Sequence, residues 1–231
     1  MKYTVLLVLA LILAGCARTA ADASSLQSEL YHHHQSFTEM VFTPSSRLFN
    51  ETTLEGLEYR ATHIVKGRMG NDARISLGFS DHTPPRLRLG SNLVSLEILE
   101  VFYGDIEKGD TILLVEPYYI VPFDILEENH FDLTGVDRSA YGVFFTVVDY
   151  LPSIPYREYI FFLGPQFSDE VREEIQGGFP VAHGERSRFL IPVDTRVRAL
   201  DLSSHELSVG PYAELDVYMS LWREVMDAYV Y

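Results

Sequence analysis

The side chains of this 231-residue chain that could perform chemistry are eight histidines, one cysteine and many carboxylates. His32, His33 and His34 form the densest cluster, but a preorganised metal site needs ligands that converge from fixed elements. The sequence contains no H-E-x-x-H motif, no G-x-S-x-G elbow and no phosphate-binding lysine loop. With 33 acidic residues, carboxylate pairs would form in any fold and identify no particular active site. We therefore predict no catalytic residue, no metal site and no cofactor.

The single cysteine, Cys16, directly follows an apolar run that begins after a lysine. The run is shorter than the roughly 20 apolar residues of a spanning helix, and it is typical of a signal peptide. The LAGC segment that ends at Cys16 resembles the lipobox of bacterial lipoproteins. In that family the cysteine receives a diacylglyceryl group and becomes the new N-terminus. The resemblance implies a lipid anchor on Cys16; an ordinary secretory signal with an unrelated cysteine is the alternative.

The formal net charge of −15 narrows the classes of partner. Nucleic acid is a polyanion, and anionic lipid would also repel such a chain, so neither is expected to hold it. Membrane association would then depend on the lipid of Cys16. We expect an extracytoplasmic location at the inner or the outer membrane, with an envelope protein or a glycan as the further partner.

The chain divides into three parts by composition. Residues 1–15 are expected to be a cleaved signal peptide, and 16–36 a lipidated flexible tether of small and polar residues. Residues 37–231 are expected to form a single domain. It should end in an amphipathic helix over 211–229, because apolar residues recur there at spacings of three and four.

Alternating or continuous apolar patterns predict most of the domain to be strands. The expected strands are 61–69, 75–79, 87–103, 111–115, 141–148, 158–163 and 188–193. A short helix should begin at Thr52 as N-cap, with Glu55 completing a capping box, and another should cover 167–175. The stretch 116–157 is rich in proline and aromatic residues and is expected to be an elaborated connection that carries a hairpin.

Three of these segments resemble a pattern of many uncharacterised secreted bacterial proteins, and the same order occurs in the netrin-like domains, which include the tissue inhibitors of metalloproteinases. The matching segments are ATHIVKG at 61–67, LEVFYG with KGDTI at 99–112, and EYIFFL at 158–163. The resemblance covers about residues 52–195 and implies a mainly β, α+β fold: an OB-like five-stranded barrel with a loop and hairpin insertion and a C-terminal helix. The inhibitors use a disulfide-bonded N-terminal cysteine, whereas Cys16 would be acylated, so their mechanism is not carried over.

Aromatic residues of the 116–157 connection are the candidates for binding a partner, because exposed tyrosines often anchor sugars, peptides or proteins. The candidates are Tyr118, Tyr119, Phe123, Phe131, Tyr141, Tyr150 and Tyr156. The alternative is that these rings pack on their own barrel. We expect a non-catalytic binding or interaction module at the cell surface; an envelope enzyme or enzyme inhibitor, with a site not visible in the sequence, remains open.

Overall fold

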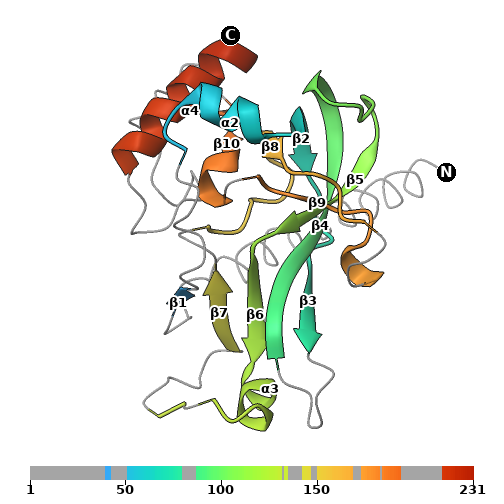
Figure 1. Cartoon of the computed structure of the whole chain (residues 1–231), viewed down its shortest axis with the longest axis vertical. Helices are drawn as coiled ribbons and strands as arrows, with labels where there is room; N and C mark the ends of the chain where they lie inside the picture. Colours follow the sequence, from blue (N-terminus) through green and yellow to red (C-terminus); the bar gives the residue numbers. More distant parts are fainter. Residues whose placement is uncertain are drawn as a thin grey trace, which may run out of the picture.

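The computed structural model describes residues 40–42, 51–79, 87–131, 133–134, 142–146, 150–168, 173–182, 184–193 and 215–231. Strands predominate over helices within these ranges, and a helix ends the chain (Figure 1). The expectation of a mainly β protein with a C-terminal helix is therefore confirmed. The expected signal peptide and tether lie outside the described residues.

The larger sheet is a curled half-barrel. Its strands, in order across the sheet, are β10 (Arg188–Leu190), β8 (Glu158–Leu163), β2 (His63–Met69), β4 (Leu87–Tyr103), β5 (Thr111–Glu116) and β9 (Phe179–Pro180). All neighbours are antiparallel except β5 and β9, which are parallel. Two register shifts interrupt the β2–β4 pair, and such bulges bend a strand and increase its twist.

Because the sheet curls, the chain just after β9 meets the end of β8 from the other part of the sheet. Val181, the residue after β9, pairs with Leu163 at the end of β8, and the Gly164 N–H donates to the Pro180 carbonyl at 2.8 Å. Inside the curl, fully buried side chains such as Leu96, Leu114 and Phe161 form one core cluster. A second cluster lies between the sheet and the helices.

A second, three-stranded sheet extends the molecule away from the half-barrel (Figure 1). It contains β1 (Met40–Phe42), β7 (Gly142–Thr146) and β6 (Tyr118–Pro122), which leads directly into α3 (Phe123–Glu128). β4 is long enough to serve both regions, because its first half pairs with β3 (Arg74–Phe79) and its second half with β2. The ring of Tyr119 lies against Gly90 of β4 so closely that a Cβ at Gly90 would be 2.4 Å from it.

Two helices cover the half-barrel at the end remote from α3 (Figure 1). α2 (Leu54–Arg60) buries Leu57, and α4 (Leu215–Tyr229) buries the apolar face that its spacing predicts. Trp222 of α4 donates its indole N–H to the Leu190 carbonyl at 2.9 Å. This bond satisfies a polar atom inside an apolar contact and fixes the helix on β10.

Several local expectations need correction. The N-cap of α2 is Thr53, whose hydroxyl accepts from the Gly56 N–H at 3.2 Å, so Thr52 and Glu55 do not form the expected capping box. Of the predicted helix over 167–175, the described part contains only a 3-10 turn, η2 (Glu173–Ile175). The strand expected over 188–193 ends at Leu190 because Pro192 follows soon after. The connection over 116–157 carries the expected hairpin, as the antiparallel pair of β6 and β7, but α3 within it was not expected.

Candidate functional site

The structure separates the aromatic candidates by burial. Tyr118, Tyr119 and Tyr150 are buried and belong to the core clusters, so for these three the packing alternative holds in this structure. Phe123 is half-buried, and Tyr141 lies outside the described residues. Phe131 and Tyr156 are 44% and 53% exposed. Among the described members of this set, Phe131 and Tyr156 are therefore the ones that offer an exposed surface to a partner.

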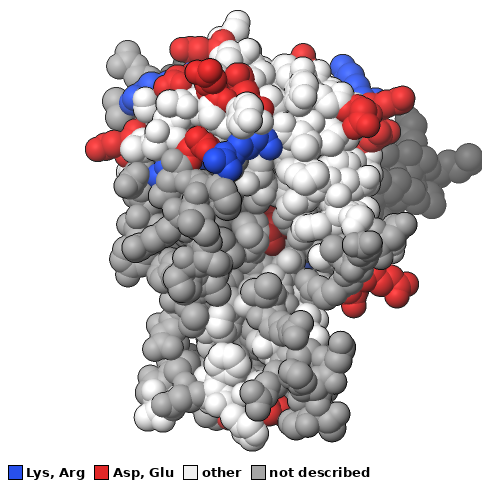
Figure 2. Space-filling model, viewed as in Figure 1, with Lys and Arg blue, Asp and Glu red and all other residues white. Residues whose placement is uncertain are grey.

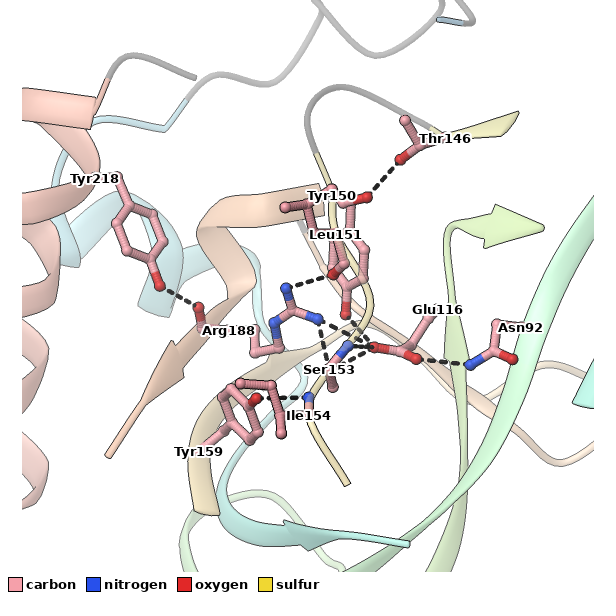
Figure 3. A network of polar contacts seen from close by, with 10 residues as sticks. All are labelled: Asn92, Glu116, Thr146, Tyr150, Leu151, Ser153, Ile154, Tyr159, Arg188 and Tyr218. Carbon is pink, nitrogen blue, oxygen red and sulfur yellow. Dashed lines mark hydrogen bonds and ion pairs between the residues drawn. The ribbon is translucent and has the colours of Figure 1, made fainter. Parts of the chain in front are cut away.

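Buried charges lie at the junction of the two sheets (Figure 3). Glu116, the last residue of β5, forms an ion pair with Arg188 of β10 at 3.1 Å, and both side chains are only 1% exposed. The same Glu116 Oε1 accepts from the Tyr150 hydroxyl at 2.9 Å and the Ser153 hydroxyl at 2.5 Å, while Oε2 accepts from Asn92 Nδ2 at 2.8 Å. A buried charge pair is tolerated only when such additional hydrogen bonds satisfy it.

Aromatic rings complete the surroundings of the Arg188 guanidinium. Its central carbon lies 4.1 Å from the ring centre of Tyr150 and 5.6 Å from that of Tyr159, which are cation–π distances. Burial opposes the charged guanidinium, but Tyr150 and Glu116 favour it, and the pKa of Arg188 lies above its ordinary value. Burial raises the pKa of Tyr150 well above its ordinary value, although Arg188 acts in the opposite direction. The phenol therefore stays neutral and donates to Glu116.

This network holds the chain segment 151–154 in place. Arg188 donates to the Leu151 carbonyl at 2.7 Å and to the Ser153 hydroxyl at 2.6 Å. The Ile154 N–H donates to the Tyr159 hydroxyl at 2.8 Å. Since these bonds come from buried partners, the segment is a rigid base for the turn that follows it.

Tyr156 occupies that turn in an unusual backbone conformation. Its φ is 62°, and the Arg157 N–H donates to the Ile154 carbonyl at 3.3 Å across the turn. Pro155 followed by a residue of positive φ is the pattern of a type II turn. Glycine or asparagine normally occupies the third residue of such a turn, which is Tyr156 here. The Tyr156 N–H also donates to the Met69 carbonyl at 2.9 Å. An exposed tyrosine is thus held where an aromatic residue costs about 1–2 kcal/mol of strain.

The other non-glycine residue with a positive φ among the described residues has an ordinary explanation. His130 has a φ of 60° and follows α3, and its N–H donates to Glu127 while the Phe131 N–H donates to Leu126. These two bonds form a Schellman motif, which requires a left-handed residue after a helix. The type II turn likewise requires a positive φ at Tyr156, but an exposed aromatic side chain stands there in place of glycine, so its strain is the better indication of a functional position.

His63 has a charged partner that the sequence did not suggest. Its Nε2 lies 2.7 Å from Asp105, which is 42 positions later and 98% exposed. Its Nδ1 lies 2.9 Å from the Thr62 hydroxyl, which can also donate to the Leu163 carbonyl at 3.2 Å. The hydrogen bond from His63 lowers the pKa of Asp105 below its ordinary value. The hydroxyl, imidazole and carboxylate link the start of β2 to the turn after β4.

Gly104 makes this contact possible, because its φ is 103° and a Cβ there would lie 2.2 Å from His63 Cδ2. We expect Gly104→Ala to lower the free energy of unfolding by about 3 kcal/mol, through backbone strain and displacement of His63. Gly109→Ala is a matched control, since its φ is 95° but no atom lies within 4 Å of the new Cβ. It should cost only about 1–2 kcal/mol. Urea unfolding of both variants checks this; equal costs would show that the His63 contact contributes little.

Within the ranges that the structure describes, no group of three or more His, Cys, Asp or Glu side chains could hold a metal ion. In the same ranges, no helix is both long and apolar enough to cross a membrane. In the comparison with known proteins, no family model, curated protein or solved structure matches the chain. A function must therefore be inferred from the sequence and the geometry alone.

Proposed function

We propose that this chain is a lipid-anchored, extracytoplasmic protein of the bacterial envelope that acts as a non-catalytic binding module. The anchor is supported by the signal-like residues 1–15 and by the lipobox-like segment that ends at Cys16. At least two membrane-anchoring signals are needed for stable attachment, and a diacylglyceryl group supplies two chains. The domain after residue 37 would then be displayed at the membrane surface.

We further propose that the half-barrel is an OB-like barrel of the kind found in netrin-like domains. Five strands support this assignment, namely β8, β2, β4, β5 and β9, because each pairs with the next in this order and a single bridge between Val181, after β9, and Leu163 of β8 returns the path to its start. OB-type folds are five-stranded, partly open barrels that bind ligands through one face and its flanking loops. A binding role would therefore suit this architecture.

The proposal of binding rests on one observation, namely that Tyr156 is exposed on a turn that the buried network supports. Its ring is half-exposed, its backbone is strained, and its turn is attached to the buried Glu116–Arg188 network through Ser153 and Ile154. A tyrosine fixed in this way loses little conformational freedom when a partner covers it, and such residues often dominate the affinity of an interface. We infer that Tyr156 is a principal contact residue for an envelope protein or a glycan.

Replacing Tyr156 by glycine separates binding from stability. Glycine removes about 1–2 kcal/mol of backbone strain, and part of this gain is offset because the unfolded chain becomes more flexible. We therefore expect Tyr156→Gly to melt at the same temperature as the native protein or slightly higher. Capture of its partners from membrane extract should nevertheless be lost, because the aromatic contact is gone.

Tyr59→Ala is the control for this experiment, since Tyr59 is 89% exposed and lies on α2, outside the turn that contains Tyr156. It should leave the captured partners unchanged. The binding proposal fails if Tyr156→Gly captures the same partners as the native protein. It also fails in this form if Tyr156→Gly unfolds, because the residue would then be structural.

A further inference from the structure

We propose that the end of the domain formed by α3 and the β3–β4 pair contacts the lipid surface to which the chain is anchored, with Phe79 and Phe131 entering its apolar layer. This inference rests on the proposed lipid anchor at Cys16. It assigns lipid, rather than a protein or a glycan, as the partner of Phe131. Tyr156 keeps its separate role, because its turn is bonded to Met69 at the junction of the two sheets.

The strand register shows from which side the anchored segment reaches the domain. β7 starts at the α3 end, where Gly142 pairs with Pro122, the residue before α3. β7 ends at the junction of the sheets, where the Thr146 hydroxyl donates to the Tyr150 carbonyl at 2.7 Å. β1 runs parallel to β7, with Met40 beside Phe144. The chain therefore enters β1 from the α3 end.

The length of chain between Cys16 and Met40 keeps this end near the membrane. If residues 17–39 form the expected tether, they span at most about 80 Å when fully extended. A flexible segment of that length averages only about 27 Å from end to end. Since β1 begins beside the middle of β7 and runs away from the α3 end, this end of the domain faces the anchored segment and is the part that most often meets the bilayer. The helices α2 and α4 lie at the opposite end (Figure 1).

Two exposed phenylalanines lie at the α3 end and are connected by short contacts. Phe79 and Phe131 are each 44% exposed. Phe79 pairs with Leu87, whose N–H donates to Asn129 at 2.8 Å, and Asn129 is the C-cap of α3, two residues before Phe131. The rings of Phe131 and Phe145 form an edge-to-face pair, with centroids 6.3 Å apart, so a core residue supports Phe131. Exposed aromatic residues on a supported surface suit the interfacial layer of a bilayer.

The charges favour an apolar contact with neutral lipid. The exposed acidic residues of α3 are Asp124, Glu127 and Glu128, and carboxylates gain nothing from anionic lipid. In the view of Figure 2, most of the visible Lys and Arg side chains lie around the α2 and α4 end, and the described atoms visible at the α3 end are white with a few red. Contact should therefore occur on zwitterionic vesicles and persist at high salt, which screens electrostatic attraction but not hydrophobic burial.

Depth-dependent fluorescence quenching tests this orientation. The mature chain would be placed in phosphatidylcholine vesicles that contain a brominated phosphatidylcholine, which quenches nearby tryptophan. Phe131→Trp and Phe79→Trp add a reporter at the α3 end, and Tyr59→Trp adds one on α2; all three retain the buried Trp222 as a constant background. We expect most of the added emission to be lost at positions 131 and 79 and none at position 59, with no change at high salt.

Equal quenching at positions 131 and 59, or quenching at neither, overturns the lipid contact. The mass of the purified chain distinguishes this failure from failure of the anchor. A chain with an unmodified Cys16 would refute lipid attachment, while quenching by added vesicles would still decide whether the α3 end enters lipid. A lipidated chain whose residues 131 and 79 stay unquenched would leave the anchor intact and refute only the orientation.

Discussion

Arg188→Ala is expected to destabilise the domain by about 3–5 kcal/mol, because it leaves Glu116 buried without its cationic partner. A domain of this kind has a total stability of about 5–15 kcal/mol, so the loss would be a large fraction of it. The change also removes a guanidinium that packs against Tyr150 and donates to Leu151 and Ser153. Urea unfolding followed by circular dichroism measures the effect.

Arg68, which forms ion pairs at the surface, supplies the control. Arg68 donates to Glu97 at 3.2 Å and to Glu158 at 2.8 Å, but its side chain is 42% exposed. Arg68→Ala should cost far less than Arg188→Ala, because solvent screens exposed ion pairs. In addition, Arg188→Met combined with Glu116→Gln should cost less than the sum of the single changes, since neither charge is then buried alone. An Arg188→Ala cost near that of Arg68→Ala would contradict this account of the network.

Cys16→Ala is expected to abolish membrane attachment, because the thioether that carries the diacylglyceryl group cannot form. Metabolic labelling with a fatty acid should give a labelled native protein and an unlabelled variant. Detergent partitioning should show the native protein with the membrane fraction, whereas any mature form of the variant should be soluble. Thr19→Ala, in the expected tether, is the matched control and should behave as the native protein. Fatty-acid label on the Cys16→Ala variant would show that lipid is attached elsewhere.

Most strands could be predicted because each satisfies a local pattern. β8 reads EYIFFL, a short apolar run bounded by polar residues and turns, and all but its first residue are buried. β4 was predicted with the bounds that the structure gives. β6 and α3 were missed, because four prolines and many aromatic residues made the 116–157 stretch look irregular. The parallel β5–β9 pair joins segments more than sixty residues apart and leaves no local signal.

The candidate site was harder to predict than the fold. Glu116 and Arg188 are 72 positions apart, and a charged residue at the end of an apolar strand usually faces solvent. Only the tertiary pairing of β5, β4, β2, β8 and β10 brings these two residues together. No sequence feature separates Tyr156, which is exposed, from Tyr118, Tyr119 and Tyr150, which are buried in the core. Pro155 indicates a turn, but the positive φ of Tyr156 opposes the preference of its residue type and could not be inferred.

Photo-crosslinking in living cells tests the proposed binding role most directly. The photoreactive residue p-benzoylphenylalanine would replace Tyr156 in the otherwise native, full-length chain, and Tyr59 in a control. Both positions are exposed, but only position 156 belongs to the turn supported by the buried network. We predict discrete adducts with an envelope component from position 156 and none from position 59. A chain that is lipidated and folded, yet gives no adduct at position 156 beyond those at position 59, would contradict the proposal that Tyr156 is the contact residue.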